Sequence, residues 1–255
     1  MKIAVTPMDA AGHLNPLLAL CTKLKDMGHE VKFFLKTEMN EEHLKKFGFG
    51  THMFGKRGLS FTKEEMYEVI PPYELQDETD KLIPDHFLYG FATIGEMLPK
   101  VLDGLQQFGA DLVIYDQTQA HGPIAAYLLD IPCVAMITLP GFNVYPILMG
   151  RHTEKEKNSS IEEFKCSRFL QKYYKDFQEQ YGFDLFDQFV PASYFLRSGL
   201  QICTGIEEFD LKMPPVFKDL YGGMDGECKY VGPMFLTDEQ GRVSSMSHGP
   251  KCEHQ

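Results

Sequence analysis

The sequence lacks features that would assign it at once to several common classes of protein. It has no apolar run of about 18 residues, the length that a membrane-spanning helix needs. Its six cysteines include no C-x-x-C pair, so we expect free thiols in a reducing compartment and no metal site. The chain opens on a short apolar strand, without the apolar region of a secretory signal. These absences together predict a cytoplasmic protein.

Positive charge is also scarce. The 25 Lys and Arg residues face 36 Asp and Glu residues, and the formal net charge is -11. Such an acidic surface repels the phosphates of nucleic acids and of anionic lipids, so neither a nucleic acid nor a membrane surface is an expected partner. The hydrophobic share of 44% is ordinary for a globular protein, and 255 residues can form one large domain or two small ones.

The order of apolar runs predicts an α/β protein. Strands are expected at 2–7, 29–36, 49–54, 111–116, 132–138, 200–204 and 229–234, and helices at 16–28, 40–47, 85–108, 119–129 and 160–180. This alternation is typical of a parallel sheet with right-handed crossovers. The segment 55–84 is polar and contains paired prolines, which indicates a long loop with at most one short helix. The polar tail 235–255 is expected to be disordered.

A histidine stands at the junction between the first strand and the first helix. In an open parallel sheet, ligands bind beyond the carboxyl ends of the strands, and His13 follows the end of the first strand. Asn15 and Pro16 form a typical helix start, and the small residues 10–12 let another molecule approach the backbone. Because the positive end of a helix disfavours an imidazolium, we expect His13 to be a neutral ring that can accept a proton.

A carboxylate that could orient this ring ends the strand at 111–116. If the strands follow the order 3-2-1-4-5, the first and fourth strands are neighbours, and His13 and Asp116 meet at their carboxyl ends. Asp116 would then orient the ring and stabilise the charge that it gains with a proton. Taken singly, His13 could be a surface or capping residue, and Asp116 could cap the following helix. No G-x-G-x-x-G loop is present, so a nucleotide-binding loop is not predicted.

Three segments resemble a known family, in the family's order. TPMDAAGHLNPLLALCTKLKDMGHEVKFF resembles the opening of the GT-B nucleotide-sugar glycosyltransferases, especially the soluble UDP-glycosyltransferase and macrolide-glycosyltransferase-like branch, with Met27 where a basic residue is usual. ADLVIYDQTQAHGPIAAYLLDIPCVAM is similar to the family's P-D-L-V-x-x-D…G-x-x-x-A…G-I-P-x-V segment, and YVGPM at 230–234 resembles the Val-Gly-Pro that closes its N-terminal domain. The resemblance implies that residues 1–234 form a Rossmann-like acceptor-binding domain.

The resemblance also implies an activity. A hexosyl group would pass, with inversion, from a nucleotide sugar such as a UDP-sugar to a hydroxyl of a small lipophilic acceptor. His13 would be the general base, and Asp116 its charge partner. The nucleotide sugar would be a co-substrate, and neither a metal nor a resident cofactor is implied.

One part of the family's pattern is missing. The donor-binding domain that follows Val-Gly-Pro, with its H-x-G…S/T-x-x-E stretch, has no counterpart, and residues 235–255 would be a truncated linker or tail. Several interpretations stay open: a fragment of a longer enzyme, a diverged paralogue, an acceptor subunit that recruits a separate donor domain, or a non-catalytic binder of small molecules. The resemblance therefore leaves open whether this chain alone is active.

In the family that these segments resemble, contacts with the acceptor come from variable loops, which differ from one member to the next. The expected residues lie near the carboxyl edge of the sheet: Gly12, Gln117, Thr118, His121, Pro140, Phe142, Phe87 and Tyr89. Small-molecule pockets are mostly apolar, which favours the aromatic members of this set. Aromatic residues at helical spacing are, however, more often part of a core.

Overall fold

The centre of the fold is a seven-stranded sheet in which each pair of neighbouring strands is parallel. The strands lie in the order β3-β2-β1-β4-β5-β6-β7. Their bounds are β1 Lys2–Thr6, β2 Glu30–Leu35, β3 Gly50–Met53, β4 Leu112–Asp116, β5 Cys133–Ile137, β6 Leu200–Cys203 and β7 Glu227–Tyr230. The computed structural model describes residues 1–55, 63–70, 85–138, 167–182, 199–209 and 227–234, without the side chains of 65, 69, 85–91, 209 and 227.

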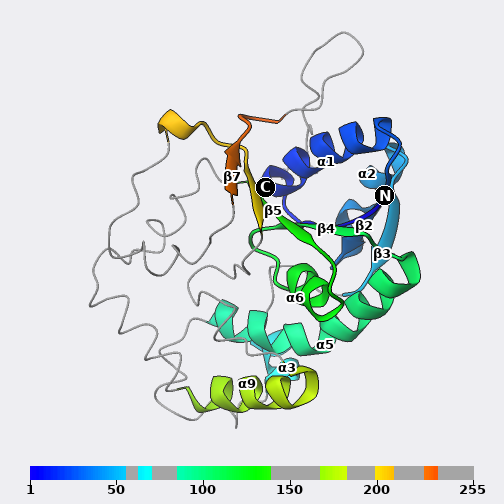
Figure 1. Ribbon diagram of the computed structural model, residues 1–255. Coiled ribbons are helices and arrows are strands. Elements are labelled where there is room, and N and C mark those ends of the chain that lie inside the picture. The colour runs from blue at the N-terminus through cyan, green and yellow to red at the C-terminus, as the bar shows by residue number, and fades with distance from the viewer. Residues whose placement is uncertain (56–62, 71–84, 139–166, 183–198, 210–226, 235–255) are drawn as a thin grey trace, which may run out of the picture.

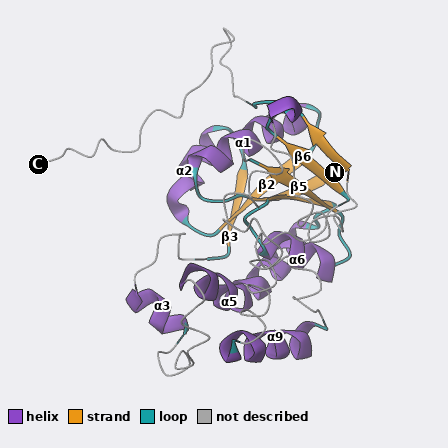
Figure 2. Cartoon of the chain, turned by 90° about the vertical axis from the view of Figure 1, so that its left-hand side faces the viewer, coloured by secondary structure: helices purple, strands orange, loops and turns teal. Residues whose placement is uncertain are grey.

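Helices cover both faces of this sheet (Figures 1 and 2). On one face lie α1 (Ala11–Asp26) and α2 (Glu41–Lys46), and on the other lie α3 (Lys63–Val69), α5 (Asp85–Phe108), α6 (His121–Leu128) and α9 (Arg168–Tyr181). Two short 3-10 helices, η1 (Glu38–Asn40) and η3 (Glu207–Phe209), follow β2 and β6. The expected fold class, a Rossmann-like doubly wound parallel sheet, is confirmed, and so is the predicted strand order.

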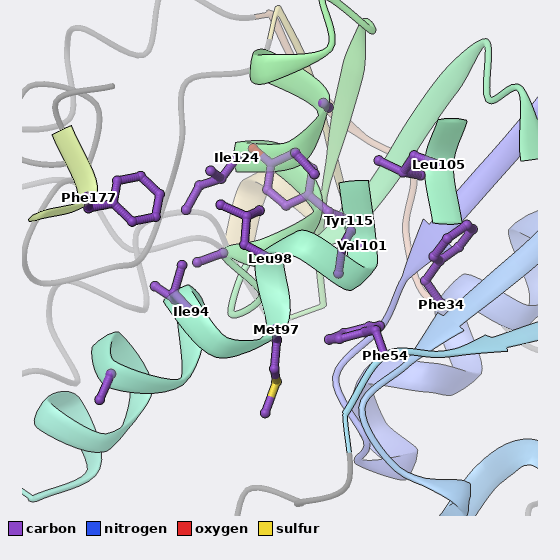
Figure 3. Close-up of a cluster of buried hydrophobic side chains, with 14 of the residues drawn as sticks. Phe34, Phe54, Ile94, Met97, Leu98, Val101, Leu105, Tyr115, Ile124 and Phe177 are labelled. Carbon is purple, nitrogen blue, oxygen red and sulfur yellow. The ribbon is translucent and has the colours of Figure 1, made fainter. Parts of the chain in front are cut away.

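The central strands are apolar along their length because both faces of the sheet are covered. Along β1, Ile3 and Val5 pack on the α1 side, whereas Ala4 between them packs on the α5 side. Figure 3 shows the larger of the two cores, in which Phe34 and Phe54 from the sheet lie beside α5 residues such as Met97. Since the two cores fix both faces of β1, the carboxyl end of this strand is held in one place.

Helix α1 begins earlier than the sequence predicted. The expected start at Asn15 and Pro16 is wrong: the helix begins at Ala11, after Ala10 as N-cap, and Pro16 lies inside it. The carbonyl of Ala10 already accepts bonds from the backbone nitrogens of His13 and Leu14, at 2.9 and 2.8 Å. Pro16 is the sixth residue of this helix and has no N–H to donate to the carbonyl of Gly12, so one backbone hydrogen bond is missing near the start of the helix. His13 is therefore part of the first turn and does not precede it.

Other boundaries differ less. Helix α9 begins at Arg168 because the Ser167 hydroxyl accepts from the backbone nitrogen of Leu170, and residues 160–166 of the expected helix lie outside the described ones. Strand β7 ends at Tyr230, so most of the predicted strand at 229–234 follows it. Gly232, with a φ of 72°, and a proline without an N–H stop the strand there. The tail 235–255 also lies outside the described part.

Two expectations of the sequence analysis, on free cysteines and on membrane-spanning helices, can be compared with the described residues. Cys21, Cys133, Cys203 and Cys228 are free thiols, while Cys166 and Cys252 are not among the residues described. Of the helices that the structure describes, none is long and apolar enough to cross a membrane.

Candidate functional site

The structure brings His13 and Asp116 together. The distance from His13 Nδ1 to Asp116 Oδ2 is 2.8 Å, although 103 positions separate the two residues. β1 lies between β2 and β4, so the first turn of α1 starts beside the carboxyl end of β4. The Asp116 side chain is fully buried, whereas the His13 side chain is 18% exposed. The pair thus joins a buried carboxylate to an imidazole that reaches the surface.

The Asp116 carboxylate accepts hydrogen bonds on both oxygens. The backbone nitrogen and the hydroxyl of Thr118 donate to Oδ1, at 2.9 and 2.6 Å. The hydroxyl of Thr138 donates to Oδ2 at 3.0 Å and shares that oxygen with His13. A carboxylate with this many donors is held in one orientation.

These bonds decide which nitrogen of His13 carries the proton. An ionised carboxylate can only accept, so Nδ1 must donate to Asp116. The Thr138 oxygen, 2.7 Å from Nδ1, gives its own hydrogen to Asp116 and accepts a share of the Nδ1 hydrogen. In the neutral ring, Nε2 is then left with a free lone pair. No described residue bonds to Nε2, so this atom can accept a proton from a bound molecule.

Thr138 is the residue of the candidate site that sequence analysis missed. It directly follows β5, and β5 pairs with β4, so its hydroxyl reaches the same edge of the sheet as Asp116. Its position at the end of an apolar strand was the available signal, because the carboxyl ends of neighbouring parallel strands adjoin. Gln117 holds this end in place: its Oε1 accepts from the backbone nitrogen of Thr138 at 2.8 Å.

The predicted acceptor contacts fall into four groups. Gly12 is exposed, and an added Cβ would meet nothing within 4 Å. Gln117 is fully buried, and Thr118 is engaged with Asp116. His121 is buried at the start of α6, close to the end of β1, since an added Cβ on Gly122 would collide with the side chain of Thr6. The remaining predicted contacts are not described: Phe87 and Tyr89 lie in α5 without described side chains, and Pro140 and Phe142 lie outside the described residues.

A second group of titratable side chains lies beside the pair formed by His13 and Asp116, which we call the dyad. Asp9, in the connection between β1 and α1, is buried, and its Oδ2 accepts from the Thr37 hydroxyl at 3.0 Å. Burial raises the pKa of Asp9, and the Thr37 bond and the charge of Lys36 offset part of that rise. Burial lowers the pKa of Lys36 to about 8, against the attraction of Asp9. Burial and the charge of Lys36 hold the pKa of His121 well below its usual value, so His121 is neutral.

Metal binding finds no support at this site. Among the described residues, no group of three or more His, Cys, Asp or Glu side chains is arranged to hold a metal ion. The donors gathered around Asp116 are hydroxyl and backbone N–H groups, which suit a carboxylate and not a cation.

Comparison with known proteins gives a likeness in structure only. No model of a protein family matches the sequence, and no curated protein matches it. Among solved structures, the glycosyltransferase of kitacinnamycin is similar with a TM-score of 0.58 and 16% identity, over 93% of this chain and 52% of that one. The calicheamicin glycosyltransferase CalG4 is similar with a TM-score of 0.58 and 18% identity, over 93% of this chain and 53% of that one.

A third similar structure is the glycosyltransferase VinC in complex with dTDP, with a TM-score of 0.52 and 16% identity over 94% of this chain. This chain covers 56% of VinC, and so spans about half the length of these glycosyltransferases. At such identities the likeness is one of fold. The parallel doubly wound architecture is thus one that known glycosyltransferases use.

Proposed function

We propose that this chain is the acceptor-binding part of a GT-B glycosyltransferase that transfers a hexosyl group, with inversion, from a nucleotide sugar to a hydroxyl of a small lipophilic acceptor. His13 is the general base and Asp116 its charge partner. The observation that carries the proposal is the 2.8 Å contact between His13 Nδ1 and a fully buried Asp116 oxygen at the carboxyl edge of the sheet. The likeness in fold to glycosyltransferases supports it.

In the proposed step, the two substrates and the dyad account for every proton and electron pair. Nε2 of His13 takes the proton of the acceptor hydroxyl, and the oxygen attacks the anomeric carbon of the donor sugar from the face opposite the diphosphate. The bond from that carbon to the diphosphate breaks, and the diphosphate leaves with the electron pair. Asp116 stabilises the imidazolium that forms, while Thr118 and Thr138 keep the carboxylate aimed at Nδ1.

The donor side of the reaction belongs to a second part in this proposal. Residues 1–234 supply the acceptor site and the base, and residues 235–255 form a linker or tail. The donor is a UDP-sugar, although the solved neighbour VinC was crystallised with dTDP. The donor-binding domain lies either in a longer form of this chain or in a separate subunit. The share of about half of each neighbour's length that this chain covers favours such a second part.

The test uses the native protein, so that any longer form or partner is retained. An antibody against residues 1–50 captures it from its source cells, and a blot gives its mass. The captured protein is incubated with UDP-glucose and a panel of phenolic and alcoholic acceptors. Mass spectrometry detects the product, and NMR gives the configuration at the anomeric carbon. We expect a β-glycoside from the α-linked donor, and a band at about twice 29.1 kDa if the donor part is in the same chain.

Matched variants assign the base. His13→Gln is expected to lower the transfer rate by about 10²–10⁴-fold, because the acceptor hydroxyl loses its base. His29→Gln is the control, since His29 lies at the opposite, amino end of the sheet, just before β2. Transfer that His13→Gln leaves unchanged would contradict the role of the base, and the absence of any sugar transfer would contradict the proposed activity.

A further inference from the structure

Two polar side chains near His13 and Asp116 have no hydrogen-bond partner among the described residues. His121 is 2% exposed, and neither ring nitrogen makes a hydrogen bond of normal geometry to a described residue, although the nearby Thr93 backbone acts to raise its pKa. Lys36 is partly buried, and its ammonium makes no hydrogen bond or ion pair with a described residue. Leaving a buried donor unpaired costs about 1–3 kcal/mol, more for a charged group.

The described neighbours of His121 and Lys36 do not supply the missing hydrogen-bond partners. The ring of Phe54 lies 5.5 Å from that of His121, and Met97 packs beside Gly55 next to the Lys36 backbone. Asp9 is the acidic group that acts on Lys36, but it does so through space and without an ion pair. Its bonded oxygen is engaged with Thr37. Apart from the charge of Asp9, the described residues thus offer no partner to the Lys36 ammonium, and the His121 ring has no hydrogen-bond partner among them.

These two groups lie at the same edge of the sheet as the dyad. Lys36 directly follows β2, and His121 begins the helix that follows Asp116 by a short turn. Asp9 lies in the connection between β1 and α1, four positions before His13 in the first turn of that helix. A small molecule with its hydroxyl at His13 could therefore extend along this edge toward Lys36.

We propose that Lys36 and His121 bind a carboxylate of the acceptor whose hydroxyl faces His13. The ammonium and the neutral imidazole N–H offer one donor to each carboxylate oxygen, and a carboxylate adds only one negative charge beside Asp9. A phosphate would bring a second negative charge close to Asp9. That the ligand is an acceptor rests on the proposed function; that the pair binds a carboxylate does not.

The test compares two probes of similar shape and different charge. Isothermal titration calorimetry at pH 7 measures the dissociation constants of 4-hydroxybenzoate and 4-hydroxybenzamide for the full chain. We expect the carboxylate to bind at least about tenfold more tightly than the amide. Lys36→Met removes the charge but keeps an apolar stem, and should abolish this preference. Lys32→Met is the matched control, because Lys32 lies on β2 and its ammonium sits 4.5 Å from the Phe108 ring.

A second measurement needs no variant. NMR of ¹³C-labelled lysine in the unmodified chain follows the titration of Lys36, whose pKa should rise when 4-hydroxybenzoate binds and stay unchanged with the amide. Equal affinity for the two probes, a preference that survives Lys36→Met, or no binding of either probe would overturn the proposal.

The test of carboxylate binding and the test of sugar transfer can give different results. His13→Gln should keep the preference for the carboxylate, because the anion contacts Lys36 and His121. If the native protein transfers no sugar but the preference is present, the carboxylate site stands and the proposed activity fails. If transfer occurs and the preference is missing, the reverse holds.

Discussion

Thr118 donates two hydrogen bonds to one oxygen of Asp116, at 2.9 Å from its backbone nitrogen and 2.6 Å from its hydroxyl. The other oxygen is thereby left to His13 and Thr138. This division holds the carboxylate in one orientation without a contribution from any ligand. The geometry of the proposed base is thus built into the folded chain before an acceptor arrives.

Removing the hydroxyl of Thr138 should destabilise the protein. Thr138→Val keeps the branched shape but leaves Asp116 Oδ2 with one donor fewer, so we expect the free energy of unfolding to fall by about 1–2 kcal/mol. Urea denaturation measures this. Thr22→Val is the control, because the Thr22 hydroxyl bonds to Leu18 within its own helix, and its loss should cost at most about 0.5 kcal/mol. Equal losses in the two variants would contradict the importance of the Thr138 hydroxyl.

Two glycines at helix starts should respond to alanine with opposite signs. In Gly122→Ala, the new Cβ would lie 2.8 Å from Cγ2 of Thr6, a short buried side chain that cannot move aside, so we expect a loss of about 1–3 kcal/mol. In Gly12→Ala, the new Cβ meets nothing within 4 Å, and the better helix former should add about 0.5–1 kcal/mol. Thermal unfolding of both variants tests this. A stable Gly122→Ala would show that α6 does not rest on β1.

Lys36 should make stability depend on pH above neutrality. Its pKa falls from 10.5 to about 8 on folding, because burial disfavours the ammonium, so between those values the unfolded chain binds more protons than the folded one. Stability from this group therefore rises as pH increases through that window, by up to about 3 kcal/mol. The groups that act on Lys36 there are Asp9, which attracts its charge, and His121, which stays neutral.

The test compares the free energy of unfolding of two proteins, the unmodified chain and Lys36→Met. Burial also raises the pKa of Cys21, Cys133 and Tyr173, and these groups make stability fall as the pH rises above their unfolded values. Urea unfolding of the unmodified chain and of Lys36→Met, between pH 7.5 and 10.5, cancels those contributions. The advantage of Lys36→Met should shrink as the pH increases. An advantage that is constant over this range would contradict the assignment.

The sheet was predictable because a strand that is buried on both faces is a continuous apolar run in the sequence. The apolar runs around β1, β4 and β5 predict the strands, and the usual strand order then places His13 beside Asp116. The start of α1 was not predictable in the same way. Asn15 and Pro16 carry a strong local signal for a helix start, but the carbonyl of Ala10 accepts the first bonds five residues earlier.

The rest of the site depends on contacts between distant segments. Thr138 looks like an ordinary strand end until β5 is placed beside β4. Lys36 looks like a solvated lysine until its neighbours Asp9 and His121 are known, because burial has no signature in a single residue. Periodicity predicts which side of a strand is apolar, and it says nothing of which polar groups meet at the strand's end.

The order of the strands has a consequence for synthesis of the chain. Strand β1 pairs with β2 almost at once, since Lys2 lies opposite Glu30, but its other neighbour arrives only with Leu112, which pairs with Ile3. At about 5–20 residues per second, the second edge of β1 stays without its partner for on the order of ten seconds on the ribosome. An apolar strand with an open edge can pair with another nascent chain. The strand that leads to the proposed base is thus exposed to misassembly until Leu112 has been synthesised.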